Sequence, residues 1–276
     1  MFKNFSKVFI VLTIACLMFT VFTSTLEAKD KIVIKGSTTV LPITQKVSEA
    51  YMAKNNVSIT IEGSGSGNGI KSLIDSTCDI ANSSREIKDS EIKSAADKGG
   101  KVKEITVAYD MIVPVVHPQN PIKNLTTAQL KGIYDGSIKN WKELGGKSGK
   151  IVVVSRETNS GTYEIWSEKI MDKKDIRRDA LLQASSGAMV STVSKNRLAI
   201  GYVGFGYINS SIQPIVVDGV QPTLENGKSG KFPISRKLYK YINERKLTPA
   251  TKKFIDFILG PEGQKLVKEA GFIPIN

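Results

Sequence analysis

The stretch SITIEGSGSGNGIKSLI at residues 58–74 changes its pattern halfway along. Its first residues alternate between isoleucine and polar side chains, which predicts a β-strand with one buried face. Glycine and serine fill most of 63–69, and Ile70, Leu73 and Ile74 then recur at the spacing of one helix face. A strand that leads into a helix through a short loop is the building unit of α/β folds. These residues therefore predict an α/β fold.

The same alternation of strands and helices continues on both sides of this stretch. Further strands are expected over 31–36, 78–84 and 151–155, and further helices over 42–54, from Ser160 and from Thr248, the last interrupted at Gly260-Pro261. Two capping boxes, Ser83 with Glu86 and Thr126 with Gln129, mark additional helix starts. The order of elements predicts a largely parallel sheet.

The apolar run ITVAYDMIVPVVH at 105–117 separates two such sets of elements. It is longer than the usual strand of about 5–6 residues, and a Pro-rich break follows it. A strand that crosses between two lobes has these properties, and we expect a second crossing at 211–219. The chain is thus divided into lobe I at 29–112, lobe II at 113–212, and a return crossing with the remainder of lobe I at 213–276.

The first 28 residues have the pattern of a secretory signal peptide. Two lysines precede the charge-free run 8–22, which is shorter than the roughly 20 residues that a membrane-spanning helix needs. Ala28 ends an acceptable cleavage site. We expect the mature chain outside the cytoplasmic membrane. Cys16 leaves a lipid anchor open as an alternative, although the apolar run continues past it.

Composition excludes several classes of protein. A hydrophobic content of 41% excludes a disordered chain. One histidine and two cysteines exclude Cys/His zinc modules and a disulfide framework, so Cys78 is interpreted as a small buried residue. Without residues 1–28 the net charge falls from +13 to +12. Because this charge is spread along the chain, in patches no longer than KKDIRR at 173–178, we expect a solvated surface and no nucleic-acid partner.

Three segments place Gly, Ser and Thr between the end of a strand and the start of a helix. They are GSTT at 36–39, GSGSGNG at 63–69 and RETNSGT at 156–162. Unpaired backbone N–H groups and the positive end of the helix dipole lie at such positions, so each segment can hold an anion. Arg156 adds a planar fork of donors that matches a tetrahedral oxyanion. Loops of this kind are also rich in Gly and Ser for purely structural reasons.

Nucleotide-binding and catalytic motifs do not fit these segments. Ile70 interrupts the Gly-Lys-Ser order of a phosphate-binding loop, and Asn68 and Ile70 occupy the positions where a dinucleotide fingerprint needs a third glycine. The only histidine, His117, precedes a proline, and no serine sits in a Gly-x-Ser-x-Gly elbow. An anion site without nucleophile, base or metal indicates binding without turnover. We therefore expect no catalytic residue, metal or cofactor.

The sequence resembles the PstS family, the extracytoplasmic phosphate-binding proteins of phosphate ABC importers. The similarity covers the mature chain and is carried by GSTTVLP (36–42), GSGSGNGIK (63–71), DIANSSREI (79–87), AYDMIVPVVHPQNP (108–121), LTTAQLKGIYDGSIKNWKELGG (125–146), SRETNSGT (155–162), AIGYVGFGY (199–207) and FILGPEGQKLVKEAGFIPI (257–275). It implies a two-lobed periplasmic-binding-protein-like fold of type II with phosphate held between the lobes. It also implies delivery of that phosphate to a membrane permease by hinge closure.

The resemblance also implies which residues bind phosphate. They are Ser37, Thr38, Thr39 and Ser66 from lobe I, and Arg156, Ser160, Gly161 and Thr162 from lobe II. Longer members of the family carry an acidic residue, which accepts the phosphate proton, where this chain has Ser84. Ser84 is expected to donate a hydrogen bond, and Arg85 to brace the loop.

Selectivity for phosphate over sulfate needs an acceptor for the phosphate proton, because an unmet buried pairing costs about 1–3 kcal/mol. We expect Asp110, in the first crossing strand, to be this acceptor. A structural hydrogen bond at the hinge is an equally good explanation of Asp110.

Three alternative functions remain at this stage. The first is the same role for another oxyanion, such as sulfate or molybdate. The second is a secreted phosphatase or another serine-dependent hydrolase. The third is a surface protein that binds nucleic acid or an anionic polymer, for which binding would depend steeply on salt. We expect a monomer that binds inorganic phosphate.

Overall fold

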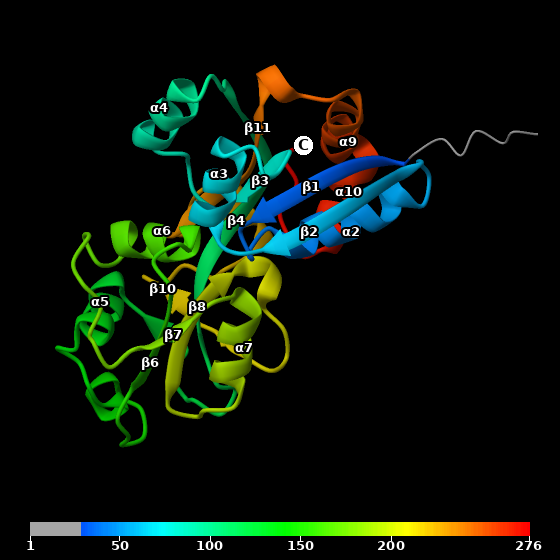
Figure 1. Ribbon diagram of the computed structural model, residues 1–276. Helices are drawn as coiled ribbons and strands as arrows, with labels where there is room; N and C mark the ends of the chain where they lie inside the picture. Colours follow the sequence, from blue (N-terminus) through cyan, green and yellow to red (C-terminus); the bar gives the residue numbers. More distant parts are fainter. Residues whose placement is uncertain (1–28) are drawn as a thin grey trace, which may run out of the picture.

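The chain folds into two α/β lobes, which Figure 1 shows one above the other. The computed structural model describes residues 29–276. The signal peptide predicted at 1–28, with Cys16, lies outside the described residues. The two-lobed α/β architecture expected from the sequence is confirmed.

The sheet of lobe I has the order β2-β1-β3-β11-β4. Its strands are β1 (Asp30–Gly36), β2 (Val57–Gly63), β3 (Ile80–Ser83), β4 (Val102–Val116) and β11 (Ser235–Asn243). β1 pairs in parallel with β2 and β3, as the βαβα order predicts. β11 is antiparallel to both of its neighbours. The prediction of parallel strand pairing is therefore confirmed for the strands that alternate with helices. It is wrong for the strands that link the lobes.

Five helices accompany the strands of lobe I. They are α2 (Leu41–Met52), α3 (Ser66–Ile74), α4 (Asp89–Asp97), α9 (Pro249–Leu259) and α10 (Pro261–Glu269). Helix α2 buries Ile43, Val47 and Tyr51, the face that its spacing predicts. Thr248 caps α9, and Gly260 separates α9 from α10, also as predicted. Tyr51 packs edge-on against Phe254, which ties α2 to α9.

Strand β4 runs from one lobe into the other. Its first part, 102–111, pairs with β11 in lobe I. Its last part, 112–116, pairs antiparallel with β8 (Ala199–Gly204) in lobe II. Figure 1 shows β4 passing between the two halves of the molecule. The crossing predicted at 105–117 is confirmed.

Lobe II continues the sheet in the order β4-β8-β6-β7. Its further strands are β5 (Asn124–Leu125), β6 (Val152–Arg156), β7 (Leu181–Gln183), β9 (Gln213–Pro214) and β10 (Val216–Val217). Its helical segments are α5 (Thr127–Asp135), η1 (Trp141–Leu144), α6 (Gly161–Lys169), α7 (Ser186–Ser194) and η2 (Phe205–Tyr207). The predicted capping box of Thr126 and Gln129 is present at α5. In the core of lobe II the rings of Trp166 and Tyr202 are stacked, with their centroids 4.2 Å apart.

The return to lobe I occurs later in the chain than 211–219. Within that segment β9 pairs with Val115 and Val116, and β10 pairs with β5, so both stay beside lobe II elements. Helix α8 (Leu224–Lys228) follows, and β11 then runs along β4 into lobe I and ends at η3 (Glu244–Lys246). The lobe boundaries proposed from the sequence stay predictions.

Local structure differs from the prediction after β3. Ser83 and Glu86 form no capping box, because the Ser83 hydroxyl instead bonds to the backbone of Arg85. Helix α4 begins later, where the Glu91 carboxylate accepts the backbone N–H of Lys88. Cys78 is buried and free, as expected.

Candidate functional site

The three Gly/Ser/Thr segments meet at the junction of the lobes. The first follows β1, the second leads from β2 into α3, and the third leads from β6 into α6. Close backbone approach brings the first two together. A Cβ at Gly69 would lie 2.5 Å from the Gly36 Cα, and Gly36 itself has φ +130°. Only glycine allows α3 to pack this tightly against the end of β1.

All ten of the predicted site residues are buried. Ser37, Thr38, Thr39, Ser66, Ser84, Asp110, Arg156, Ser160 and Thr162 are each at most 3% exposed, and Gly161 is also buried. Such a concentration of polar groups away from water is stable only if each of them has a partner. Together with Ser186 and Arg236, these residues find their partners largely among themselves, across the two lobes. We call this set of buried polar residues the cluster.

Hydroxyl pairs join the loop of lobe I to lobe II. The Thr39 and Thr162 hydroxyl oxygens are 2.8 Å apart, and those of Thr38 and Ser186 are 3.4 Å apart. The Tyr207 hydroxyl donates to the Thr38 carbonyl. Ser37 accepts the Thr39 backbone N–H and so fixes the turn of the loop. The lobes are in direct contact at this cluster.

The second loop meets the start of α6. The Ser66 hydroxyl accepts the Ser84 backbone N–H at 3.1 Å and lies 3.3 Å from the Ser84 hydroxyl. A Cβ at Gly161 would come within 2.5 Å of the Ser66 oxygen, which explains the glycine at that position. Ser160 caps α6 by accepting the Tyr163 backbone N–H. The N-terminus of α6 thus faces two hydroxyls of lobe I.

Arg156 is a buried cation without an anionic partner among the described residues. Its guanidinium donates to the carbonyls of Gln183 and Ala184 and to the hydroxyls of Ser186 and Thr38. All four groups are neutral, and the side chain makes no ion pair within residues 29–276. Burial lowers the pKa of Arg156. A buried charge normally requires an opposite charge, so this cluster is electrostatically prepared for an anion.

Asp110 is fully buried and forms an ion pair with Arg236 of β11. Its carboxylate accepts two hydrogen bonds from Arg236, at 2.9 and 2.8 Å, and one from the Phe205 backbone N–H at 2.9 Å. Burial raises the pKa of Asp110, and the Arg236 guanidinium opposes that rise. These contacts match the structural interpretation of Asp110 at the hinge. They leave acceptor capacity on the oxygen that receives only the Phe205 N–H.

Hydrogen bonds from nitrogen orient several hydroxyl groups as donors. Thr38 accepts from Arg156 and from the Ser186 backbone N–H, and Thr162 accepts from Arg236 at 3.0 Å. Ser66 accepts from the Ser84 backbone N–H. A hydroxyl whose oxygen already accepts must point its hydrogen at another acceptor. The cluster therefore presents O–H groups ready to donate to an oxyanion.

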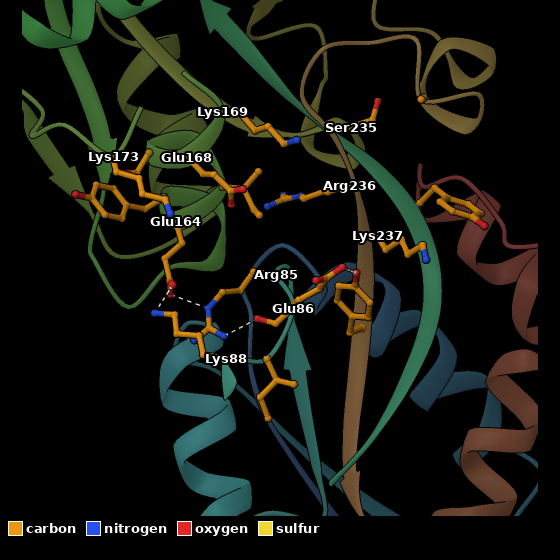
Figure 2. Close-up of a pocket in the computed structure, with 18 of the residues that line it drawn as sticks. Arg85, Glu86, Lys88, Glu164, Glu168, Lys169, Lys173, Ser235, Arg236 and Lys237 are labelled. Carbon is orange, nitrogen blue, oxygen red and sulfur yellow. Dashed lines mark hydrogen bonds and ion pairs between the residues drawn. The ribbon is translucent and has the colours of Figure 1, made fainter. Parts of the chain in front are cut away.

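Ion pairs outside the cluster connect the same two lobes. Arg85 is held by Glu91 of α4 and donates to Glu164 of α6 at 2.7 Å, and Lys88 also pairs with Glu164. Arg85 therefore braces its loop, as expected. Figure 2 shows the bonds of Arg85 and Lys88 to Glu164 at the edge of a cavity of about 810 Å³, into which Arg236 points from β11. Lys169 and Lys173 line the same cavity.

Two residues of the cluster were missed by the sequence analysis. Arg236 lies on a strand that was not predicted, and Ser186 starts a helix that was not predicted. The run LYKYI at 238–242 was the available signal for β11, because aromatic and β-branched residues are enriched in strands. Neither residue could be assigned a partner without the fold.

Metal ligation has no candidate in the described part of the chain. No group of three or more His, Cys, Asp or Glu side chains is close enough there to hold an ion. His117 lies just beyond the end of β4, where its ring accepts the Gln119 backbone N–H. It makes no contact with the cluster.

Comparison with known proteins places the chain among binding proteins. Residues 23–262 match the family model of the PBP superfamily domain. The phosphate-binding protein PstS of Borreliella burgdorferi is 33% identical over 91% of this chain and 92% of its own length. PstS of Staphylococcus saprophyticus is 35% identical over 87% of this chain and 79% of its own.

A solved structure is similar over the whole described fold. It is a Clostridium perfringens substrate-binding protein, assigned to a phosphate ABC transporter, with bound phosphate. It has a TM-score of 0.85 and 38% identity, and the match covers 90% of this chain and all of that one.

The pairing of Asp110 with Arg236 predicts strong energetic coupling. We expect Arg236→Met and Asp110→Asn each to lower the free energy of unfolding by about 3–5 kcal/mol, because each leaves a buried polar partner unpaired. The double variant should lose much less than the sum. Urea unfolding measures all three, with the exposed Arg197→Met as control. Additive losses would contradict this coupling.

Proposed function

This chain belongs to the PBP superfamily and within it to the PstS family, and from that premise we propose that it binds inorganic phosphate and delivers it to an ABC permease. The phosphate would lie at the junction of the lobes, among the buried hydroxyls and Arg156. The relatives named PstS and the C. perfringens structure with bound phosphate support this ligand.

The observation that carries the proposal is the unpaired guanidinium of Arg156. It is 2% exposed and is surrounded by neutral groups. A small dianion beside it would supply the missing opposite charge, and the hydroxyls of Thr38, Ser66 and Thr162 would donate to its oxygens. Charge-assisted hydrogen bonds of this kind are roughly twice as strong as neutral ones. Backbone N–H groups at the start of α6 add further donors.

Hinge closure explains how a buried anion enters and leaves. The donors come from both lobes, so a complete site exists only when the lobes are together. β4 is continuous between the lobes, and β11 runs beside it into lobe I, so these two strands can serve as the hinge. The bonds between Arg85 and Glu164 and between Thr39 and Thr162 would break on opening. In this proposal the permease recognises the closed, phosphate-bound form.

Selectivity for phosphate is proposed to depend on an acceptor for its proton. The hydroxyls of Thr38, Ser66 and Thr162 accept from nitrogen and have their hydrogens to donate, so they suit sulfate and phosphate alike. The Asp110 oxygen that receives only the Phe205 N–H, and the Ser84 hydroxyl, retain the capacity to accept. We assign the main role to Asp110, since a carboxylate facing sulfate would place acceptor against acceptor.

The setting of this activity follows from the same resemblance. We infer an extracytoplasmic location for the mature chain. Within residues 29–276 no helix has the length and apolar character needed to cross a bilayer. We infer binding without catalysis, because His117, the one histidine, follows Val116 at the end of β4, where that strand pairs with Ile200 and Gln213. Asp110 of the cluster lies six positions before Val116 on β4. A monomeric state, and the absence of a nucleic-acid partner, stay predictions.

The first test replaces the unpaired cation. Arg156→Met should weaken phosphate binding by about a hundredfold or more, because the anion loses its opposite charge. Isothermal titration with phosphate, arsenate, sulfate and molybdate measures this and ranks the ligands. Arg197→Met, on the surface of the same lobe, is the matched control. If wild-type protein bound sulfate or molybdate more tightly than phosphate, phosphate would be ruled out as the main ligand. The chain would then be a binding protein for that other oxyanion.

The second test concerns the proton acceptor. Asp110→Asn should weaken phosphate binding by about tenfold or more beyond any loss for sulfate, because the amide cannot accept in the same way. Ser84→Ala is the comparison, with a smaller expected change in the ratio. Thermal unfolding of each variant controls for folding. Equal losses for the two anions would restrict Asp110 to its structural pair with Arg236.

The third test concerns closure. Small-angle X-ray scattering should show a smaller radius of gyration with saturating phosphate than without it, because the lobes close over the anion. The Arg156→Met variant at the same phosphate concentration should remain expanded. An unchanged radius of gyration in the wild type at saturation would rule out hinge closure.

A further inference from the structure

Lys240 is a buried amine in the core of lobe I. The residue is 0% exposed, on β11, and its Nζ donates to the Asn82 side-chain oxygen at 2.7 Å and to the Thr44 hydroxyl at 2.9 Å. Both partners are neutral, and no carboxylate within residues 29–276 pairs with it. A lysine in this position is costly to the fold, since burial strongly disfavours its charged form. Nothing in the proposed phosphate chemistry so far uses it.

The two partners of Lys240 hold the first phosphate loop. The Asn82 carbonyl accepts the Ser37 backbone N–H at 2.8 Å, and its side chain also donates to Thr44. The Thr44 hydroxyl in turn donates to the Val40 carbonyl. The amine is therefore linked, through one side chain on each side, to both ends of the loop that carries Thr38 and Thr39.

Other charges do not neutralise this amine. β3 carries no charged residue. The charged side chains on the adjacent elements are exposed or partly exposed, except that Asp110 and Arg236 are paired with each other. They are Asp30, Lys31 and Lys35 on β1, Lys46 and Glu49 on α2, Lys71 on α3, Lys103, Glu104 and Asp110 on β4, Arg236 and Lys237 on β11, and Lys252, Lys253 and Asp256 on α9. Burial lowers the pKa of Lys240 to about 7, with no opposing charge. Its charge state thus responds to any new anion near it.

We propose that Lys240 takes up a proton when phosphate enters the neighbouring loop, and so supplies a second buried positive charge to the complex. This inference rests on the proposed function. A dianion in a region of low dielectric favours the charged amine, and by linkage the charged amine favours the dianion. Lys240 is a positioning residue in this scheme, since it acts on the anion through Asn82 and the loop.

The linkage has a definite sign. In this scheme phosphate raises the pKa of Lys240. The gain in phosphate affinity is therefore complete when the pH is below the pKa that Lys240 has in the phosphate-free protein. This gain in affinity is lost as the pH rises through the pKa that Lys240 has in the phosphate complex. A rise of one unit corresponds to about a tenfold gain in affinity. Wild-type protein should therefore bind phosphate about tenfold more tightly than Lys240→Met at about pH 6, and about equally at pH 9 or above.

Isothermal titration with inorganic phosphate tests this directly. The wild type, Lys240→Met and the control Lys237→Met, an exposed neighbour on β11, are titrated between about pH 6 and 9 in buffers of different ionisation heat. Proton uptake near pH 8 should be larger in the wild type and the control than in Lys240→Met. The ionisation of phosphate itself contributes equally to all three. The same pH profile and proton count in Lys240→Met as in the wild type would overturn the proposal while leaving phosphate binding intact.

A second measurement does not depend on a variant that folds. In wild-type protein labelled with ¹³C at the lysine Cε, one resonance should titrate near neutral pH without phosphate. It should titrate at least about one unit higher with saturating phosphate. A lysine resonance at neutral pH that phosphate leaves unshifted would overturn the proposal. Absence of any phosphate binding by the wild type would instead overturn the proposed function.

Discussion

The guanidinium of Arg156, buried among neutral partners, is the interaction on which the site depends. A cation removed from water is stabilised only by groups that replace its hydration or by an opposite charge. Here two carbonyls and two hydroxyls satisfy the hydrogen bonds and leave the charge uncompensated. The other buried guanidiniums of the lobe junction differ, because Arg85 has Glu91 and Glu164 and Arg236 has Asp110. This contrast is the reason that we assign Arg156 to the proposed anion and the other two guanidiniums to the contact between the lobes.

The long strand β4 explains why such a site can open. It belongs to both sheets, with β11 beside it in lobe I and β8 in lobe II. The donors of the site are placed at the ends of strands on either side of this connection. In the proposed opening, movement about β4 and β11 would separate Thr38 and Ser66 from Arg156 and Thr162 and leave each core intact. The stacked aromatic rings beside β6 and the helices packed on β1 keep each half rigid.

Buried polar groups form a connected network beyond the anion itself. Asp110 orients Arg236, Arg236 orients Thr162, and Thr162 contacts Thr39 of the opposite lobe. Lys240 supports the same loop from the core through Asn82. Networks of this kind stabilise one arrangement when every member is satisfied. The loop of lobe I is thus held from the hinge and from the core, which fixes the positions of the hydroxyls that we propose as phosphate donors.

Local sequence patterns were sufficient for the strands and helices that alternate along the chain and for the three Gly/Ser/Thr loops, but not for every element. Alternation and helical spacing predicted β1, α2, β2, α3 and β6, and the length of the run at 105–117 predicted the crossing strand, because these signals act over neighbouring residues. The resemblance named the hydroxyls and Arg156. The partner of Asp110 could not be predicted, since Arg236 lies 126 positions away and β11 was not recognised. Ser186, the return strand and the burial of Lys240 likewise depend on which distant segments pack together, and only the tertiary structure decided them.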